Sequence, residues 1–254
     1  MSQFRLAYLN VSHASLLAFL VSLPLAIAPK CEADDNYSDR QIHQWTVHVR
    51  NDLQRTVPRQ TTKALELLES QLLEITQKLP REAVTELRKV ELWFSPKYVG
   101  FQERAEYHPN ADWLKKNNRN PAMAKGVEFS NISIFEAETR RMPNFALHEL
   151  AHAYHDRVLG VDEPQLKKAF EEAKQSGNYN RVARRDANGK VTYQTAYAMT
   201  NVNEFFAECS EAFFSTNDFF PFNNVELKEI DPTAHSLIAK LWNSPPNRDK
   251  RPPD

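Results

Sequence analysis

The feature that most constrains this chain is an apolar helix with three ionisable side chains at its centre. The run from Asn144 to Gly160 reads NFALHELAHAYHDRVLG, in which Asn144 suits a helix start and Gly160 suits its end. Apolar side chains surround nearly the whole circumference of this helix, which predicts that it is buried. Because a buried polar group without a partner is unfavourable, His148, Glu149 and His152 require a compensating interaction.

A metal ion would provide that interaction. His148 and His152 lie about 40° apart around the helix and about 6 Å apart along it, so both imidazoles can converge on one cation. Glu149 is rotated by about 100° from His148, away from the ligands but within reach of a metal-bound water. This H-E-x-x-H arrangement is typical of zinc hydrolases. The alternative is a core helix whose histidines are satisfied by hydrogen bonds.

A catalytic zinc site needs a third protein ligand. His155 shares the helix face, but a straight helix cannot bring it to the same ion, so we interpret it as a residue behind the ligands or in solvent. In the later segment TNVNEFFAECSEAFF, Glu204, Glu208 and Glu211 form one stripe of a predicted helix. Such a stripe is often solvated. The two phenylalanines beside it favour a metal site instead, and we predict Glu204 as the third ligand and Glu208 as a hydrogen-bond partner of a ligand histidine.

Two motifs together resemble a known family. HELAH (His148 to His152) followed by TAYAMTNVNEFFAE (Thr195 to Glu208) is similar to the catalytic domain of anthrax lethal factor and its relatives, which include bacterial Pro-Pro endopeptidases. The resemblance is confined to residues 145–214. Matched residue by residue, it implies zinc ligands His148, His152 and Glu204, general base Glu149 and oxyanion donor Tyr197.

The resemblance implies a zinc-dependent metallopeptidase of the gluzincin type, with one zinc ion per chain and a peptide or protein substrate. The oxyanion donor has alternatives in Tyr154, Tyr193 and His235. The function has alternatives too. A zinc amidase acting on cell-wall peptides would use the same residues, and a non-catalytic zinc-stabilised binding protein would not need Glu149 or Tyr197.

The first 33 residues are interpreted as a signal peptide. Ser15 to Ala28 is an uncharged, mostly apolar run that is shorter than the roughly 20 residues of a membrane span. Cleavage is expected after Ala28 or Ala33, which predicts a secreted or periplasmic protein without stable membrane association after processing. The alternative is an uncleaved anchor. Cleavage after Ala33 would leave Cys209 without a disulfide partner.

The remaining pattern predicts a zincin-like single domain of the α+β class over residues 34–242, followed by a disordered tail at 243–254. We expect a small, mostly antiparallel sheet, the active-site helix behind it and a helical C-terminal half. Alternation and spacing predict strands at 44–50, 90–94 and 126–135 and a helix at 61–79. The strand at 126–135 changes parity near Ser130, which predicts a bulge, and we expect this strand to pair with an extended substrate.

The charge balance argues against one class of partner. Lys and Arg total 32 against 33 Asp and Glu, for a formal net charge of −1. Without a basic excess, the chain has no global field to hold a polyanion, so we expect no nucleic-acid partner. The sequence leaves the oligomeric state open.

Overall fold

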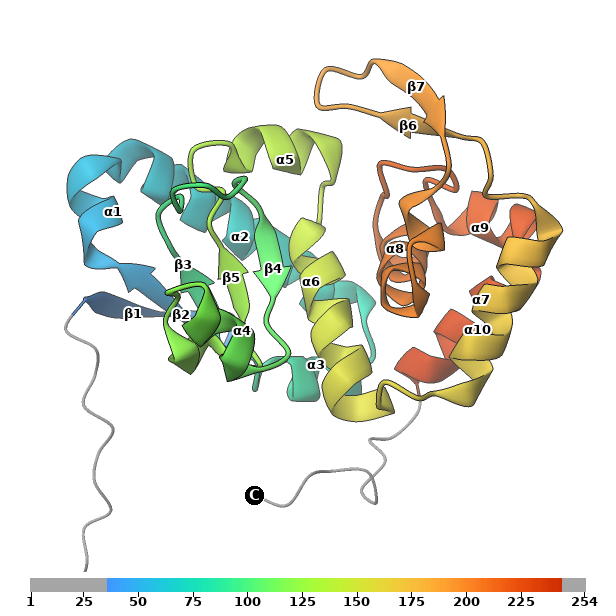
Figure 1. The fold of residues 1–254 in the computed structure, drawn as a ribbon, viewed down its shortest axis with the longest axis horizontal. Helices are drawn as coiled ribbons and strands as arrows, with labels where there is room; N and C mark the ends of the chain where they lie inside the picture. Colours follow the sequence, from blue (N-terminus) through green and yellow to red (C-terminus); the bar gives the residue numbers. More distant parts are fainter. Residues whose placement is uncertain (1–35, 244–254) are drawn as a thin grey trace, which may run out of the picture. The chain divides into compact units, whose positions relative to one another are not determined.

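A computed structural model describes residues 36–243, which form a mixed α+β fold with a small sheet and a helical C-terminal half (Figure 1). The signal peptide predicted at 1–33 and all but the first residue of the predicted tail lie outside the described residues. Among the described helices, none combines the length and apolar character that crossing a membrane requires.

The first half of the described chain carries the main sheet. Its elements are β1 (Tyr37–Ile42), β2 (Trp45–Arg50), α1 (Asn51–Thr56), α2 (Pro58–Lys78), α3 (Arg81–Leu87), β3 (Leu92–Phe94), β4 (Ala105–Tyr107), α4 (Ala111–Lys116), a 3₁₀ turn (Pro121–Met123), β5 (Val127–Phe129) and α5 (Phe135–Arg141).

The second half is helical except for one hairpin. Its elements are α6 (Phe145–Tyr154), a π-helical turn (His155–Leu159), α7 (Pro164–Ser176), β6 (Val182–Arg185), β7 (Val191–Gln194), a 3₁₀ turn (Tyr197–Met199), α8 (Val202–Phe214), α9 (Asn224–Ile230) and α10 (Pro232–Trp242).

The main sheet is mixed, so the expectation of a mostly antiparallel sheet is wrong. The strand order is β1-β2-β3-β5-β4. The outer pairs β1–β2 and β4–β5 are antiparallel, whereas β2–β3 and β3–β5 are parallel. The parallel pairing of β2 with β3 follows from the connection between them, because α1, α2 and α3 return the chain to the starting edge of the sheet.

Alternation and spacing predicted two of the early elements well. In β2, Trp45, Val47 and Val49 are fully buried, as the period of two requires. The helix predicted at 61–79 is α2, which begins earlier, at Pro58, because proline suits the first turn of a helix. Thr61 therefore lies inside the helix, where its hydroxyl donates to the carbonyl of Val57 at 2.9 Å.

The strand predicted at 126–135 is wrong in length. Only β5 (Val127–Phe129) is extended, and it has no bulge; a turn follows and α5 begins at Phe135. The change of parity near Ser130 marks the end of the strand. Phe135 packs its ring against Phe129 and Phe145, which explains why this later apolar residue is buried without belonging to the strand.

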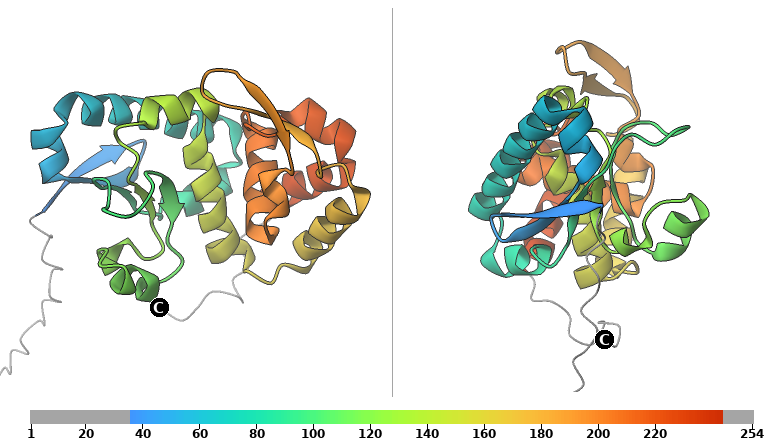
Figure 2. Two further views of the ribbon diagram at one scale, coloured as in Figure 1. Left: turned by 45° about the horizontal axis from the view of Figure 1, so that its top comes forward. Right: turned by 90° about the vertical axis from the view of Figure 1, so that its left-hand side faces the viewer.

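Helix α6 lies between the sheet and the C-terminal helices, and it contacts β4, β5, α2 and α8 (Figures 1 and 2). Asn144 caps its start by accepting from the backbone N–H of Leu147. The π-helical turn extends it to Gly160, whose φ of 83° ends the helix in a conformation that favours glycine. Helix α10 is fixed to α6 by the stacked rings of Tyr154 and Trp242.

Candidate metal centre

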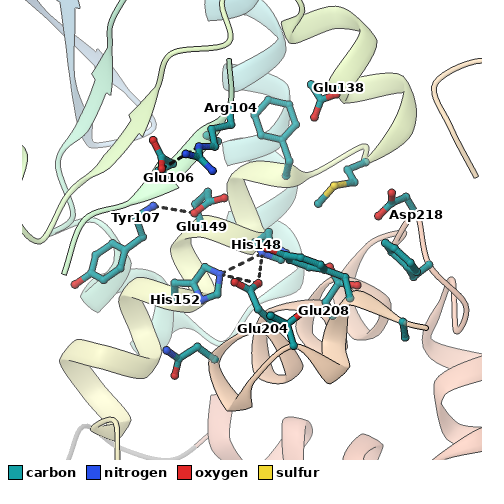
Figure 3. A pocket seen from close by; sticks show the side chains of 18 of the residues that line it. Arg104, Glu106, Tyr107, Glu138, His148, Glu149, His152, Glu204, Glu208 and Asp218 are labelled. Carbon is teal, nitrogen blue, oxygen red and sulfur yellow. Dashed lines mark hydrogen bonds and ion pairs between the residues drawn. The ribbon is translucent and has the colours of Figure 1, made fainter. Parts of the chain in front are cut away.

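A cleft of about 1060 Å³ opens along α6 (Figure 3). One wall is β4, the strand at the end of the sheet, and the opposite wall is α8 with the end of the β6–β7 hairpin. The lining side chains include all the residues predicted to carry chemistry: His148, Glu149, His152, Tyr197, Glu204 and Glu208.

His148, His152 and Glu204 converge in this cleft (Figure 3). The Nε2 atoms of the two histidines are 3.1 Å apart, and Glu204 Oε2 lies 3.1 Å from His148 Nε2 and 3.3 Å from His152 Nε2. Ligands about 2.1 Å from a tetrahedral zinc ion are about 3.4 Å apart, so the spacing of these atoms fits one ion. Two nitrogens and one carboxylate oxygen are also a donor set that zinc accepts.

The local sequence places each of these ligands. His148 and His152 occupy successive turns of α6. Glu204 lies in the first turn of α8, whose start is fixed by Asn201: its side chain accepts from the backbone N–H of Asn203 and Glu204.

His148 and Glu204 shift each other's pKa. Burial opposes the charged form of His148, but its hydrogen bonds with Glu204 and Glu211 raise its pKa above the ordinary value. Burial also opposes the charged form of Glu204, yet its hydrogen bonds with His148 and His152 lower its pKa. Glu204 is therefore a carboxylate, the form in which it can bind a cation.

Glu149 points from α6 toward the wall of the cleft that β4 forms (Figure 3). Its Oε2 accepts from the backbone N–H of Tyr107 in β4 at 2.8 Å. This contact could not be predicted from the sequence, because a strand of only three residues, such as β4, shows no recognisable periodicity. The hydrogen bond holds the Glu149 carboxylate beside the ligand atoms without making it a ligand.

The hydrogen-bond partner of His148 Nδ1 is Glu211, so the prediction of Glu208 for this role is wrong. Glu211 Oε2 lies 2.9 Å from His148 Nδ1, whereas Glu208 Oε1 lies at 3.6 Å. Glu208 instead accepts from Asn217 Nδ2 at 3.0 Å. When Nε2 of His148 faces a metal, Nδ1 carries the proton and donates a hydrogen bond to Glu211.

Both of these carboxyl groups are buried, so the solvated interpretation of the acidic stripe is wrong for Glu208 and Glu211. Burial raises the pKa of Glu208 to about 8 and that of Glu211 to about 7, with His148 opposing both shifts. Asp218, also buried, lies at the same end of the cleft and is paired with Arg141 at 2.6 Å and Arg184 at 3.0 Å. No local sequence pattern predicts this ion-pair cluster, because its members come from three separate segments of the chain.

Tyr197 lines the cleft from the 3₁₀ turn before α8, with 46% of its surface exposed. Its ring stacks on Phe219 at a centroid distance of 6.5 Å. Burial and the nearby Glu204 raise the pKa of its hydroxyl, so it stays protonated and able to donate. The alternatives Tyr154, Tyr193 and His235 do not line the cleft.

His155 is not solvated. It is 2% exposed and packs against Phe206, in the π-helical turn that follows α6. Burial, together with the charge of nearby His152, lowers its pKa to about 4. His155 is therefore a neutral side chain behind the ligand pair, which agrees with the first of the two interpretations of its role.

A second group of potential ligands, Glu106, His108 and Glu128, is already neutralised. Arg119 donates from Nη1 to Glu106 at 2.6 Å and to Glu128 at 3.0 Å. His108 Nε2 lies 2.9 Å from Glu128. The guanidinium occupies the place that a cation would take, and the cluster fixes β4 and β5 to the segment that carries α4.

Comparison of the chain with protein-family models, with curated proteins and with solved structures found no match. The resemblance to the lethal factor family therefore remains a prediction from two motifs. What supports a function is the geometry of the cleft.

Proposed function

We propose that this chain is a zinc-dependent metallopeptidase with one zinc ion per chain. The observation that carries the proposal is the convergence of His148 Nε2, His152 Nε2 and Glu204 Oε2 in an open cleft that also holds Glu149. A structural zinc site is usually closed by a fourth protein ligand, whereas a catalytic site leaves that position to water or substrate.

A zinc ion held there would lower the pKa of a coordinated water toward about 7 and polarise the substrate carbonyl. Glu149 would accept the proton of the attacking water and pass it to the leaving amine nitrogen. The N–H of Tyr107 would keep the Glu149 carboxylate in place through the cycle. The Tyr197 hydroxyl would donate to the carbonyl oxygen as negative charge develops on it.

The walls of the cleft favour a polypeptide substrate. Residues 104–107 line it, and β4 pairs with β5 on one side only, which leaves its other edge directed toward the cleft. An extended peptide can add to such an edge. The strand expected to do this, at 126–135, is β5; that expectation is wrong because β5 is paired on both sides, with β3 and β4.

We further propose that the protein is exported and acts outside the cytoplasm. This rests on the apolar run at 15–28, which the described residues do not include. Processing after Ala28 or Ala33 would leave the whole described chain in the mature enzyme. N-terminal sequencing of protein recovered from the culture medium or periplasm checks the site of cleavage.

The experiment that tests the activity is mass-spectrometric profiling of a peptide library with zinc-loaded wild type and Glu149→Gln. We expect cleavage by the wild type and none by the variant, with equal zinc in both, because Glu149 does not contact the metal. Equal cleavage by the two proteins would refute the assigned role of Glu149. Hydrolysis of amide bonds in peptidoglycan fragments, with the library peptides left intact, would assign the same site to an amidase instead.

A further inference from the structure

The β6–β7 hairpin has a strand edge that the proposed active site does not use. Within the described residues, β6 and β7 form a separate two-stranded sheet, and no strand pairs with the outer side of β7. Figure 1 draws the hairpin above α8 with β7 outermost, and the right-hand view of Figure 2 shows it projecting beyond the helices.

The register shows which backbone groups point outward. The N–H of Asp186 donates to the carbonyl of Lys190 at 3.0 Å, so this pair and every second pair along the ladder exchange hydrogen bonds. The intervening residues of β7, Val191 and Tyr193, therefore direct their N–H and C=O groups away from β6. By the same alternation, the next hydrogen-bonded pair is Arg184 with Thr192, which lie opposite each other in the register.

The outward backbone groups of β6 already have partners, whereas those of β7 have none among residues 36–243. The N–H of Phe220 donates to the backbone carbonyl of Ala183 at 2.9 Å, and the N–H of Arg185 donates to the backbone carbonyl of Asp218 at 2.9 Å. Those bonds attach the hairpin to the segment after α8. The outer edge of β7 is thus the open side of the structure, with alternate donors and acceptors in the arrangement that binds another strand.

The side chains of β7 leave this edge accessible. All four residues of β7 are exposed, including Val191 at 46% and Tyr193 at 60%. Proteins usually protect an open edge with proline, a bulge or charged residues on the strand, and VTYQ contains none of these. β-Branched and aromatic residues also favour strand pairing.

The positive charge of the hairpin indicates an acidic partner. Four basic residues lie on it or directly beside it, against one acid, Asp186. In the described part of the chain only one of the four, Arg184, is in an ion pair; the other three are Arg181, Arg185 and Lys190. They are exposed, so they would attract an acidic segment.

The edge is continuous with the cleft. Arg184, Gln194 and Thr195 line the cleft, and Tyr197 follows in the same segment. A chain that lies beside Tyr197 and continues outward therefore reaches the end of β7. We propose that the outer edge of β7 binds an extended, acidic segment of the substrate polypeptide beyond the cleft, by adding it as a strand. This inference rests on the proposed peptidase function.

The test compares a short peptide that the enzyme cleaves with two longer versions of it. One version carries Glu-Val-Glu-Thr-Glu-Val at its N-terminus, and the other carries the same extension at its C-terminus. The acidic extension at one end is expected to raise kcat/KM by about tenfold, through KM, and a version with lysine for glutamate should bring no gain. Val191→Pro removes one outward N–H without breaking a β6–β7 hydrogen bond, and it should abolish the gain. Cleavage of the short peptide should be unchanged, because Val191 does not line the cleft.

A second variant guards against misfolding of the proline protein. Arg181→Glu with Lys190→Glu reverses the charge of the hairpin and should also abolish the gain. The matched control is Lys115→Glu with Lys116→Glu, the same change of charge on exposed residues of α4, and it should keep the gain. Equal rates for short and extended peptides in the wild type, or a gain that survives both hairpin variants, would overturn the proposal.

A binding measurement separates this proposal from the activity. Fluorescence anisotropy of the labelled acidic extension is measured on Glu149→Gln protein with and without Val191→Pro. If no peptide is cleaved, the proposed function fails, yet weaker binding by the proline protein still supports a strand-binding edge, and equal binding refutes it. A wild-type dimer in sedimentation that Val191→Pro dissociates, with no gain from any extension, would assign the edge to a second copy of the chain and overturn the substrate proposal.

Discussion

Replacing Glu211 is expected to weaken zinc binding more than replacing Glu208, although both are buried on α8 below the same histidine. The reason is the difference between a hydrogen bond of 2.9 Å and a separation of 3.6 Å from His148 Nδ1. Glu211→Leu removes the acceptor. Glu211→Gln keeps an acceptor oxygen but removes the charge, so its effect should lie between those of wild type and leucine.

A hydrogen bond to a charged group contributes about 1.5–3 kcal/mol, and loss of such a partner of a ligand histidine costs about 10–100-fold in metal affinity. We therefore expect Glu211→Leu to raise the dissociation constant of zinc by about 10–100-fold. Glu208→Leu should raise it by less than about threefold, because Glu208 makes its hydrogen bond to Asn217.

The metal-free protein should respond differently. Burial raises the pKa of Glu211 to about 7 from the ordinary 4.5, so the folded state binds this proton more tightly than the unfolded state. Such a group contributes less stability as the pH rises through that window. Leucine at 211 should therefore leave the apo protein as stable as wild type, or more stable, at neutral pH.

The assay is competition for zinc with a chelator of known affinity, run beside thermal unfolding of the apo proteins. Lower zinc affinity with an unchanged or higher apo melting temperature would show that Glu211 acts through His148. Equal losses for the leucine variants at 208 and 211, or a loss of zinc affinity that only follows a loss of apo stability, would refute the reasoning.

Three further predictions follow from the same geometry. Tyr197→Phe should lower kcat by about 10²–10³-fold with zinc content unchanged, and steady-state kinetics with metal analysis checks this; an unchanged kcat would remove Tyr197 from the reaction. Arg119→Met should destabilise the fold by about 3–5 kcal/mol, since it leaves Glu106 and Glu128 without their shared cation, and urea unfolding measures this; a change below about 1 kcal/mol would contradict the pairing. Removing zinc should lower the melting temperature in calorimetry, with free zinc at about 1,000 times its dissociation constant restoring about 4 kcal/mol; a melting temperature that does not depend on zinc would count against a folded-state site.

The parts that local spacing determines could be predicted from the sequence. His148 and His152 belong to one helix, so their convergence follows from the helical repeat alone. The cap at Asn201 and the buried face of β2 follow equally from local patterns. Glu204 could be predicted as a ligand because the apolar neighbours on its helix indicate burial at that position.

The parts that depend on how elements pack could not be predicted in the same way. Glu208 and Glu211 lie on the same stripe of α8, and only the crossing of α6 with α8 decides which of them meets His148. The Tyr107 contact with Glu149 likewise depends on where the short strand β4 joins the sheet. The parallel order of β2, β3 and β5 is set by the connections between strands, which the alternation within each strand does not reveal.

The central claim is that one zinc ion lies between His148, His152 and Glu204, and diffraction from crystals of the zinc-loaded protein, collected at the zinc absorption edge, tests it most directly. The account predicts one strong anomalous peak per chain, about 2.0–2.2 Å from His148 Nε2, His152 Nε2 and a Glu204 oxygen, with at least one position left to water. A peak at Glu106, His108 and Glu128, or no peak at the histidine pair, would contradict it.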